Sequence, residues 1–300
     1  MHRLVIIGNG FDIAHRIKSK YSDFRDYLLK SNAEFVKAIA KYIPDDLLWS
    51  DFEVALGNLD YEQLFDDNNH YLVPYSDEDW SESFHHDYQY EIGRALAFGQ
   101  EIPNKLKSWI GSIITNVPRV FSPEVISHDN VYLCFNYTDT LEKSYQVDHK
   151  LIKYIHGCFR TGDELIIGHN DSHFKETDEF LASADADDFM HTVSDVRIEE
   201  AERIVRSYSK TTFKDTSDIV QREHTFFDSL VDVSEILVIG HSYSFVDLDY
   251  FAAIKSRVCD NCLWKLTCYN GEDLRRAYKL IDRLSISNTD ITNVSNLYIN

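Results

Sequence analysis

Short apolar runs that end abruptly in Gly, Asn or His recur along the chain and set the strongest limit on its fold. They are LVIIG (4–8), VYLCFN (131–136), KYIHG (153–157), LIIGH (165–169), EILVIGHS (235–242) and LWKLTCYN (263–270). Runs without polar alternation suit strands that are buried on both faces, as in a parallel sheet covered by helices. Segments with helical periodicity, such as DLRRAYKLIDRL, lie between them. The sequence therefore predicts an α/β fold with a parallel sheet.

The apolar runs fall in three separated parts of the chain, which we expect to form one α/β core from residues 1–25, 131–170 and 233–300. The segments between them, 26–130 and 171–232, are dominated by helical and charged patterns and are predicted to be two large helical insertions. A chain of 300 residues can bury roughly three quarters of its unfolded surface, which is enough for such a core.

The charge balance and the cysteines exclude several classes of protein. A formal charge of -20, from 50 acidic and 30 basic residues, repels a nucleic-acid backbone, so nucleic acid is not an expected partner. The apolar runs are too short for a signal peptide or a membrane span, which predicts a cytoplasmic protein that does not bind a membrane. Five cysteines with a single CxxC, Cys259 and Cys262, indicate reduced thiols, and we expect no metal.

Polar side chains follow several of the predicted strands. They are Asn9, Asn136, His156, His169, and His241 with Ser242. The carboxyl ends of parallel strands share one edge of the sheet, and ligands of doubly wound folds bind in the crevice there. We therefore predict that these side chains converge on a ligand.

The first turn, Gly8-Asn9-Gly10-Phe11-Asp12, allows two interpretations. It is a tight connection from a strand to a helix, for which glycine supplies the backbone freedom. Alternatively, its free N–H groups cradle a phosphate at the start of the helix. Asp12 also has two possible roles, which are capping of the helix and contact with hydroxyl groups of a ligand.

Two further carboxylates stand where helices are expected to begin. Thr138 or Asp139 is predicted to cap the helix of TLEKSY, which would leave Asn136 facing the crevice. Asp247 is predicted to be the N-cap of the helix that follows it.

Six motifs occur in a fixed order: GNGFDIAH, SKYSDF, FNYTDTLE, YIHG, IIGHND and IGHSYSFVDLDYF. This series resembles the bacteriophage abortive-infection family AbiH over almost the whole chain. More distantly, it is similar to sirtuin-type NAD-binding domains, including NAD-hydrolysing defence proteins. The resemblance implies antiviral defence, a Rossmann-like, sirtuin-like sheet and NAD as substrate or ligand.

The resemblance also implies a role for each matching residue. Asn136 is similar to the asparagine that positions the attacking group at the nicotinamide ribose, and His156 to the histidine that acts as base, so these two are the predicted catalytic residues. The predicted cofactor-binding residues are Gly8, Asn9, Gly10, Phe11, Asp12, Asp23, Gly240, His241 and Ser242. The zinc module of sirtuins is missing, so protein deacylation is not predicted.

Three functions remain open from the sequence. The first is an NAD hydrolase that acts as an abortive-infection effector, and the second is a module that senses NAD or an ADP-ribose derivative without cleaving it. The third is a metal-dependent nuclease or phosphodiesterase that uses His156, His169, Asp171 and His173. The expected partner is a small-molecule nucleotide, and a phage trigger, a second defence protein or a second copy of the chain are the further candidates.

Overall fold

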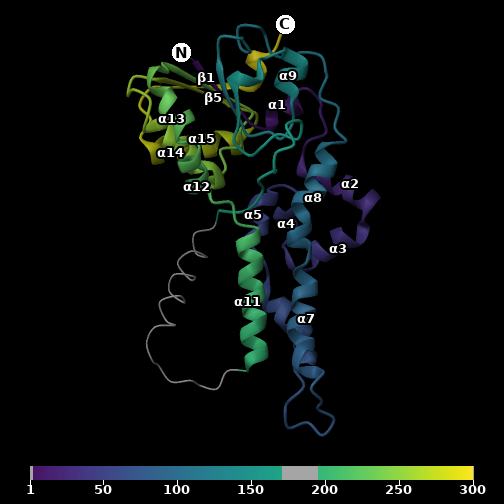
Figure 1. Ribbon diagram of the computed structural model, residues 1–300. Helices are drawn as coiled ribbons and strands as arrows, with labels where there is room; N and C mark the ends of the chain where they lie inside the picture. The colour runs from purple at the N-terminus through teal and green to yellow at the C-terminus, as the bar shows by residue number, and fades with distance from the viewer. Residues whose placement is uncertain (1–2, 171–194, 300) are drawn as a thin grey trace. The chain divides into compact units, whose positions relative to one another are not determined.

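A six-stranded parallel sheet forms the centre of the fold. The computed structural model describes residues 3–170 and 195–299 (Figure 1). The strands are β1 (Arg3–Ile7), β2 (Val131–Cys134), β3 (Ile152–Tyr154), β4 (Glu235–Ile239), β5 (Leu263–Cys268) and β6 (Thr289–Asn293), and every neighbouring pair is parallel. The prediction of a Rossmann-like parallel sheet is confirmed.

The order of the strands across the sheet is β3-β2-β1-β4-β5-β6. This is the order of two mononucleotide-binding halves joined back to back, and it reverses between β1 and β4. The register pairs Ile7 with Cys134 on one side and with Ile239 on the other. The carboxyl ends of β2, β1 and β4 therefore lie level with each other.

Each face of the sheet is buried under its own layer of helices, because alternate residues of a strand point to opposite faces. Leu4 and Ile6 of β1 join a core cluster with Phe227, Tyr250 and residues of the helices nearby. The helices and short 3-10 turns of this layer are α12 (Thr216–Arg222), α13 (His224–Asp228), η3 (Ser229–Asp232), η4 (Phe245–Asp247), α14 (Leu248–Lys255) and α15 (Gly271–Leu284) (Figure 1).

Val5 and Ile7 of β1 point to the other face, where they pack with Phe11, Phe121 and Tyr145. Phe11 and Phe121 stack with their ring centroids 5.1 Å apart. This layer contains α1 (Asn9–Ala14), α9 (Thr140–Tyr145), η2 (His149–Leu151) and η5 (Val294–Leu297). Both faces of these strands are buried, which explains why the sequence contains continuous apolar runs.

The chain divides into two compact units. The sheet unit comprises the described residues of Met1–Phe24, Leu106–Ile166 and Asp215–Asn300, and the helical unit comprises those of Arg25–Lys105 and Ile167–Lys214. The segments 106–130 and 215–232, predicted to be parts of insertions, therefore belong to the sheet unit. Phe121 and Phe227 pack in its two cores, which explains their assignment.

The helical unit consists of short helices and one long pair. Its elements are α2 (Tyr21–Ser31), α3 (Ala33–Tyr42), α4 (Asp45–Leu48), α5 (Phe52–Leu56), α6 (Tyr61–Asn68), η1 (Asn69–Tyr71), α7 (Phe84–Leu96), α8 (Phe98–Ile110) and α11 (Val196–Thr211), of which α2 and α8 extend into the sheet unit. Helices α7 and α11 run side by side (Figure 1). None of the helices in the described residues is long and apolar enough to cross a bilayer.

Two details of the predicted sheet were wrong. LIIGH (165–169) is not a strand of the sheet, and its one ladder contact is an isolated bridge between His169 and Phe213 in the helical unit. The sixth strand is instead β6, with the sequence TDITN, which pairs with β5 at the edge. An edge strand needs no apolar run, because one side of it is not covered by a neighbouring strand.

The turns after β1 and β4 are held in direct backbone contact. Gly10 N–H donates to Gly240 O at 2.7 Å, and Gly8 N–H donates to Ile239 O at 3.0 Å. Gly240 has a φ of +64°, and a Cβ atom there would overlap the Phe11 nitrogen. Only glycine satisfies both the left-handed conformation and the close approach.

We expect Gly240→Ala to lower the free energy of unfolding by about 3 kcal/mol or more, because it adds a steric clash to an unfavourable φ. Gly162→Ala is the matched control: Gly162 has a φ of +77°, but a Cβ atom at this position would have no described atom within 4 Å. The control substitution should lower the free energy of unfolding by about 1–2 kcal/mol. Chemical denaturation of both variants measures the difference, and equal losses would show that the contact between the turns contributes nothing.

Candidate active site

Four of the predicted polar positions lie at the carboxyl ends of neighbouring strands. Asn9, Asn136, His156 and His241 follow β1, β2, β3 and β4, and these strands are adjacent in the sheet. The rings that flank Asn136, those of Phe135 and Tyr137, lie with their centroids 5.3 and 6.4 Å from that of His156. The structure thus brings these four positions to one edge, whereas His169 belongs to the helical unit.

The glycine turn after β1 has less capacity to bind a phosphate than its sequence indicates. The N–H groups of Gly8 and Gly10 donate to carbonyl groups of the β4 end, so neither is free for a ligand. Helix α1 has only six residues, and its dipole is correspondingly small. Close packing of the two turns is sufficient to explain why positions 8 and 10 are glycine. The phosphate cradle stays a prediction, and it would depend on N–H groups of the turn other than those of Gly8 and Gly10.

The other predicted cofactor-binding residues have varied surroundings. Asn9 is exposed, and its Nδ2 donates to Ser19 O at 2.7 Å, while Ser242 is exposed beyond β4. Phe11 is fully buried in the core. Asp23 lies in the first turn of α2, where its carboxylate accepts the Lys20 N–H at 3.0 Å. Asn9 and Ser242 are therefore accessible, whereas Phe11 and Asp23 have structural partners.

A buried polar cluster lies at the ends of β1 and β2. Thr138 Oγ1 donates to Asp12 Oδ2 at 2.5 Å, and Thr140 Oγ1 lies 3.3 Å from Thr138 Oγ1. Asp12 is 1% exposed and Asn136 is 6% exposed. Among the described residues, Asp12 Oδ1 and both amide atoms of Asn136 have no hydrogen-bond partner of acceptable geometry. Buried polar atoms are rarely left in this state unless the site has a function or holds a further molecule.

The environment of Asp12 changes its acidity. Burial raises the pKa of its carboxyl group from 3.8 to about 6, although the hydroxyl groups of Thr138 and Thr140 and the nearby Asn136 amide favour the ionised form. The negative charge of Asp139 adds a small increase to this pKa. Asp12 is thus a carboxylate whose protonation changes close to physiological pH, a property typical of acid–base groups in active sites.

A second buried cluster contains both histidines of the strand ends. Tyr243 N–H donates to His241 Nδ1 at 2.9 Å, so His241 carries its proton on Nε2, which lies 3.3 Å from Asp247 Oδ2. His156 Nε2 lies 3.2 Å from the Tyr250 hydroxyl and 3.9 Å from Asp247 Oδ1. One buried carboxylate therefore faces two imidazole rings.

Phe135 packs against both histidines of the second cluster. Its ring makes edge-on contacts with His156 and His241, with centroid distances of 5.3 and 4.6 Å. Phe135 and Tyr250 belong to the core under α14, whereas Cys134 and Phe11 belong to the core on the opposite face. His156 is consequently packed among aromatic rings, and the polar neighbour of Asn136 is Asp12.

Asp139 and Asp247 occupy the N-cap positions predicted for them. Both residues precede helices, α9 and α14, but neither side chain makes a capping hydrogen bond. Asp139 Oδ1 accepts a hydrogen bond from Thr115 at 2.5 Å, and Asp247 faces the histidines. Sequence reasoning missed Thr138, Asp247 and Tyr250 as site residues, because their positions fit local roles and their partners are distant in the chain.

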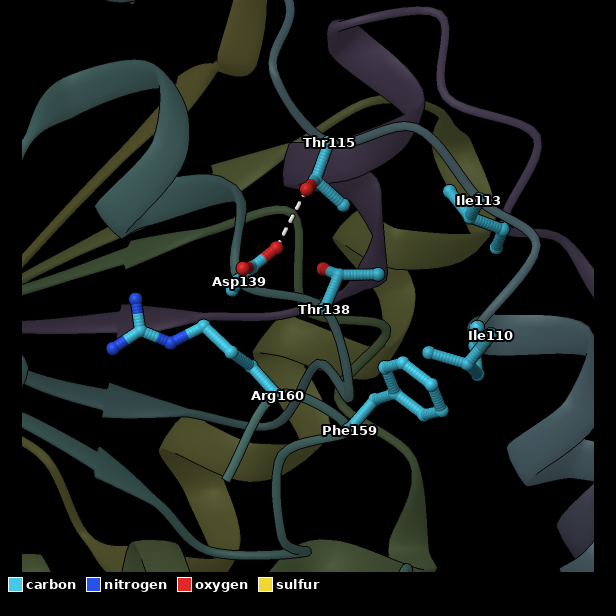
Figure 2. Close-up of a pocket in the computed structure, with 8 residues that line it drawn as sticks. Ile110, Ile113, Thr115, Thr138, Asp139, Phe159 and Arg160 are labelled. Atoms are coloured by element: carbon cyan, nitrogen blue, oxygen red, sulfur yellow. Dashed lines mark hydrogen bonds between the residues drawn. The ribbon is translucent and has the colours of Figure 1, made fainter. Parts of the chain in front are cut away.

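A pocket of about 330 Å³ opens beside the Asp12 cluster. It is lined by Ile110, Gly111, Ile113, Thr115, Thr138, Asp139, Phe159 and Arg160. Figure 2 shows the bond between Thr115 and Asp139 on one side and the apolar side chains of Ile110, Ile113 and Phe159 on another. Thr138 belongs both to this wall and to the bond with Asp12, so it links the pocket to the buried carboxylate.

Arg160, the cationic residue that lines the pocket, is already paired with an acidic side chain. Arg160 Nη2 lies 3.3 Å from Glu142 Oε1, and Figure 2 shows the guanidinium group directed away from Phe159 and Ile110. Glu142 also accepts the hydroxyl of Tyr154 at 2.9 Å. Gly111 lets the Phe159 ring lie against the end of α8, because a Cβ atom there would be 2.5 Å from the ring. The pocket therefore offers an aromatic face, hydroxyl groups and a carboxylate.

The metal hypothesis finds no preformed set of ligands. Within 3–170 and 195–299, no group of three or more His, Cys, Asp or Glu side chains is arranged to hold a metal ion. His169 makes backbone hydrogen bonds with Thr212 and Lys214, and Asp171 and His173 lie outside the described residues. The nuclease alternative is left untested by these observations.

The strand order and the polar side chains at the β2, β1 and β4 ends define a Rossmann-like α/β protein with a candidate ligand site at its topological switch point. The chain matches the family described as bacteriophage abortive infection AbiH over residues 4–268, and it belongs to that family. The predicted resemblance to AbiH is confirmed, and the family gives the protein a role in phage abortive infection. No curated protein and no solved structure matches the chain.

The stability of the protein should depend on the ionisation of Asp12. Because folding raises its pKa, the contribution of Asp12 to stability is fully present below about pH 4 and is lost as the pH rises through about 6. The loss is about 3 kcal/mol, at about 1.4 kcal/mol per pH unit. Asp12→Asn should remove this dependence and be more stable than wild type at pH 8. Thermal unfolding from pH 4 to 8 tests this, and parallel curves for the two proteins would contradict it.

The Asp247 carboxylate should contribute to stability through the buried histidines. Asp247→Ala leaves the Nε2–H of His241 without its acceptor, so we expect a loss of about 2 kcal/mol in the free energy of unfolding. Asp232→Ala, at an exposed carboxylate, is the control and should change stability by less than about 0.5 kcal/mol. Urea denaturation of the two variants provides the measurement. Equal stability of both would show that the carboxylate does not matter to the histidine cluster.

Proposed function

We propose that this protein acts in phage abortive infection by binding NAD at the carboxyl edge of its sheet and hydrolysing the nicotinamide–ribose bond. The observation that carries the proposal is the pair of buried side chains Asn136 and Asp12, with three polar atoms that have no hydrogen-bond partner among the described residues. They lie at the carboxyl ends of β1 and β2, beside the point between β1 and β4 where the strand order reverses, and this reversal is the ligand site of dinucleotide-binding folds.

The chemistry makes modest demands on the protein. Cleavage of a glycosidic bond passes through an oxocarbenium-like transition state. The leaving nicotinamide ring of NAD is already cationic, so it needs little acid catalysis. The site must orient a water molecule, accept its proton and shield the developing positive charge on the ribose. The Asn136 amide has the acceptor and the donors needed to orient a water without adding charge.

The pocket beside Thr138 supports the same proposal. Its volume of about 330 Å³ lies in the range of small-molecule sites and suits one half of a dinucleotide. The Phe159 ring offers a face for a flat heterocycle, and the Asp139 carboxylate would favour a cationic one. We therefore assign the nicotinamide ribose to this pocket and the adenosine half to the exposed end of β4, around Ser242.

The strongly negative charge of the chain does not preclude binding of an anionic dinucleotide. Charges more than about 10 Å apart are largely screened at 0.1 M salt, whereas hydrogen-bond donors act at contact range. The exposed Asn9 lies at the strand edge and offers an amide for such contacts. Binding of NAD should accordingly depend little on ionic strength.

The direct test is to incubate the purified protein with NAD, with and without extract of infected cells, and to measure free nicotinamide. We expect release by wild type and a loss of at least about 100-fold in Asn136→Ala, because the attacking water is no longer oriented. Asn288→Ala, at an exposed asparagine that binds Asn261 O, is the control and should keep full activity.

The same measurement separates the alternatives. Binding of NAD without nicotinamide release under any condition would contradict hydrolysis and favour a sensor of NAD or ADP-ribose derivatives. Absence of binding would remove NAD as the ligand. Cleavage of nucleic acid that a chelator abolishes would instead favour the metal-dependent alternative.

A further inference from the structure

The Asp12 carboxylate has the position and the partners of a reacting group. We infer that Asp12, rather than His156, accepts the proton of the attacking water in the hydrolysis proposed above, with Thr138 as its positioning residue. This inference rests on the proposed function. It changes the assignment of the base that the family resemblance implies.

The Asp12 carboxylate is held through one of its two oxygens. Thr138 Oγ1 donates to Oδ2 at 2.5 Å and fixes the orientation of the group, while Thr140 lies behind Thr138. The second oxygen, Oδ1, has no hydrogen-bond partner among the described residues. One oxygen is therefore anchored and the other is open to a proton, although the Thr140 hydroxyl and the Asn136 amide lie close enough to stabilise the ionised carboxylate.

The Asn136 amide is the neighbour of the Asp12 carboxylate that can orient a water molecule. Asn136 lies close enough for its amide to favour the ionised form of Asp12, and its Oδ1 and Nδ2 have no hydrogen-bond partner in the described chain. A water molecule that attacks the ribose needs one acceptor to orient it and one base to take its proton. An amide and a carboxylate side by side supply these two functions.

His156 has polar and aromatic partners of its own. Its Nε2 lies 3.2 Å from the Tyr250 hydroxyl and faces Asp247 at 3.9 Å, and its ring packs against Phe135. These contacts place the imidazole among aromatic side chains of the core under α14. His156 is therefore engaged with the His241 and Asp247 cluster, where it supports the end of β3.

The acidity of Asp12 agrees with this role. Burial raises its pKa to about 6, so the carboxylate is mostly ionised at neutral pH and is still basic enough to take a proton. The charged or titratable groups that face it are Asp139, which raises the pKa slightly, and Cys134, whose own thiol is neutral because burial raises its pKa well above 9. The remaining contacts are the neutral Thr138, Thr140 and Asn136.

In the proposed step one C–O bond forms, one C–N bond breaks and one proton is released. The water oxygen forms a bond to C1′ of the ribose, and the bond from C1′ to the nicotinamide nitrogen breaks with its electron pair going to the ring, which becomes neutral. The water proton passes to Asp12 Oδ1 and is then released to solvent. The products are nicotinamide, ADP-ribose and one proton.

The test compares the pH profiles of nicotinamide release in four proteins. Wild type should show a rise in kcat with a midpoint near pH 6, because the base must be ionised. Asp12→Asn should lose at least about 100-fold in kcat with little change in KM and should lack this rise. His156→Gln should lose less than about tenfold and keep the rise. Asp129→Asn, at an exposed carboxylate, should match wild type.

A Thr138→Val variant provides a second measurement. Loss of the hydroxyl removes an interaction that favours ionised Asp12, so the midpoint should move to higher pH while the variant stays folded. The inference is overturned if the rise near pH 6 persists in Asp12→Asn and vanishes in His156→Gln. Absence of nicotinamide release by wild type would instead refute the proposed function, with which the inference falls.

Discussion

The backbone contact between the turns after β1 and β4 is the constraint on which the rest of the site depends. Gly10 and Gly240 approach so closely that neither position has room for a side chain. The hydrogen bond from Gly10 N–H to Gly240 O fixes the first residues of α1 against the end of β4. This fixed start of α1 brings Asp12 beside Thr138, and the conformation of Gly240 directs His241 toward Asp247. Two glycines thus determine the positions of both polar clusters.

The sheet could be predicted from the sequence because burial on both faces leaves a simple signal. Four runs of consecutive apolar residues correspond to β1, β2, β4 and β5, and KYIHG to the short β3. The sixth strand could not be found in this way, since TDITN lies at an edge and carries polar residues. LIIGH is as apolar as the true strands, but the boundary between the two units falls inside it, after Ile166, and it forms no strand of the sheet. Packing outside the sheet buries its apolar side chains, and an apolar run alone does not indicate which kind of packing buries it.

The candidate site could be predicted only where position along a strand was sufficient. Asn136, His156 and His241 were found because each follows a buried run, and the parallel topology does bring them to one edge. Asp247 and Thr138 could not be found, since a residue before a helix has a ready local explanation as a cap. Their actual partners are distant in sequence: Thr138 bonds Asp12 across 126 positions. Patterns within a few residues do not contain such pairings.

The division of the edge into two clusters follows from the geometry of β2. Successive residues of an extended chain point to opposite faces, so Phe135 and Asn136, directly after the strand, have different surroundings. Phe135 belongs to the aromatic core with His156 and His241, while the neighbour of Asn136 is Asp12 on the first helix. His241 and His156 both face the Asp247 carboxylate inside an aromatic core, and His156 also lies at hydrogen-bond distance from the Tyr250 hydroxyl. The amide and carboxylate on the other side retain unmatched polar atoms beside an open pocket, and for that reason the chemistry is assigned to them.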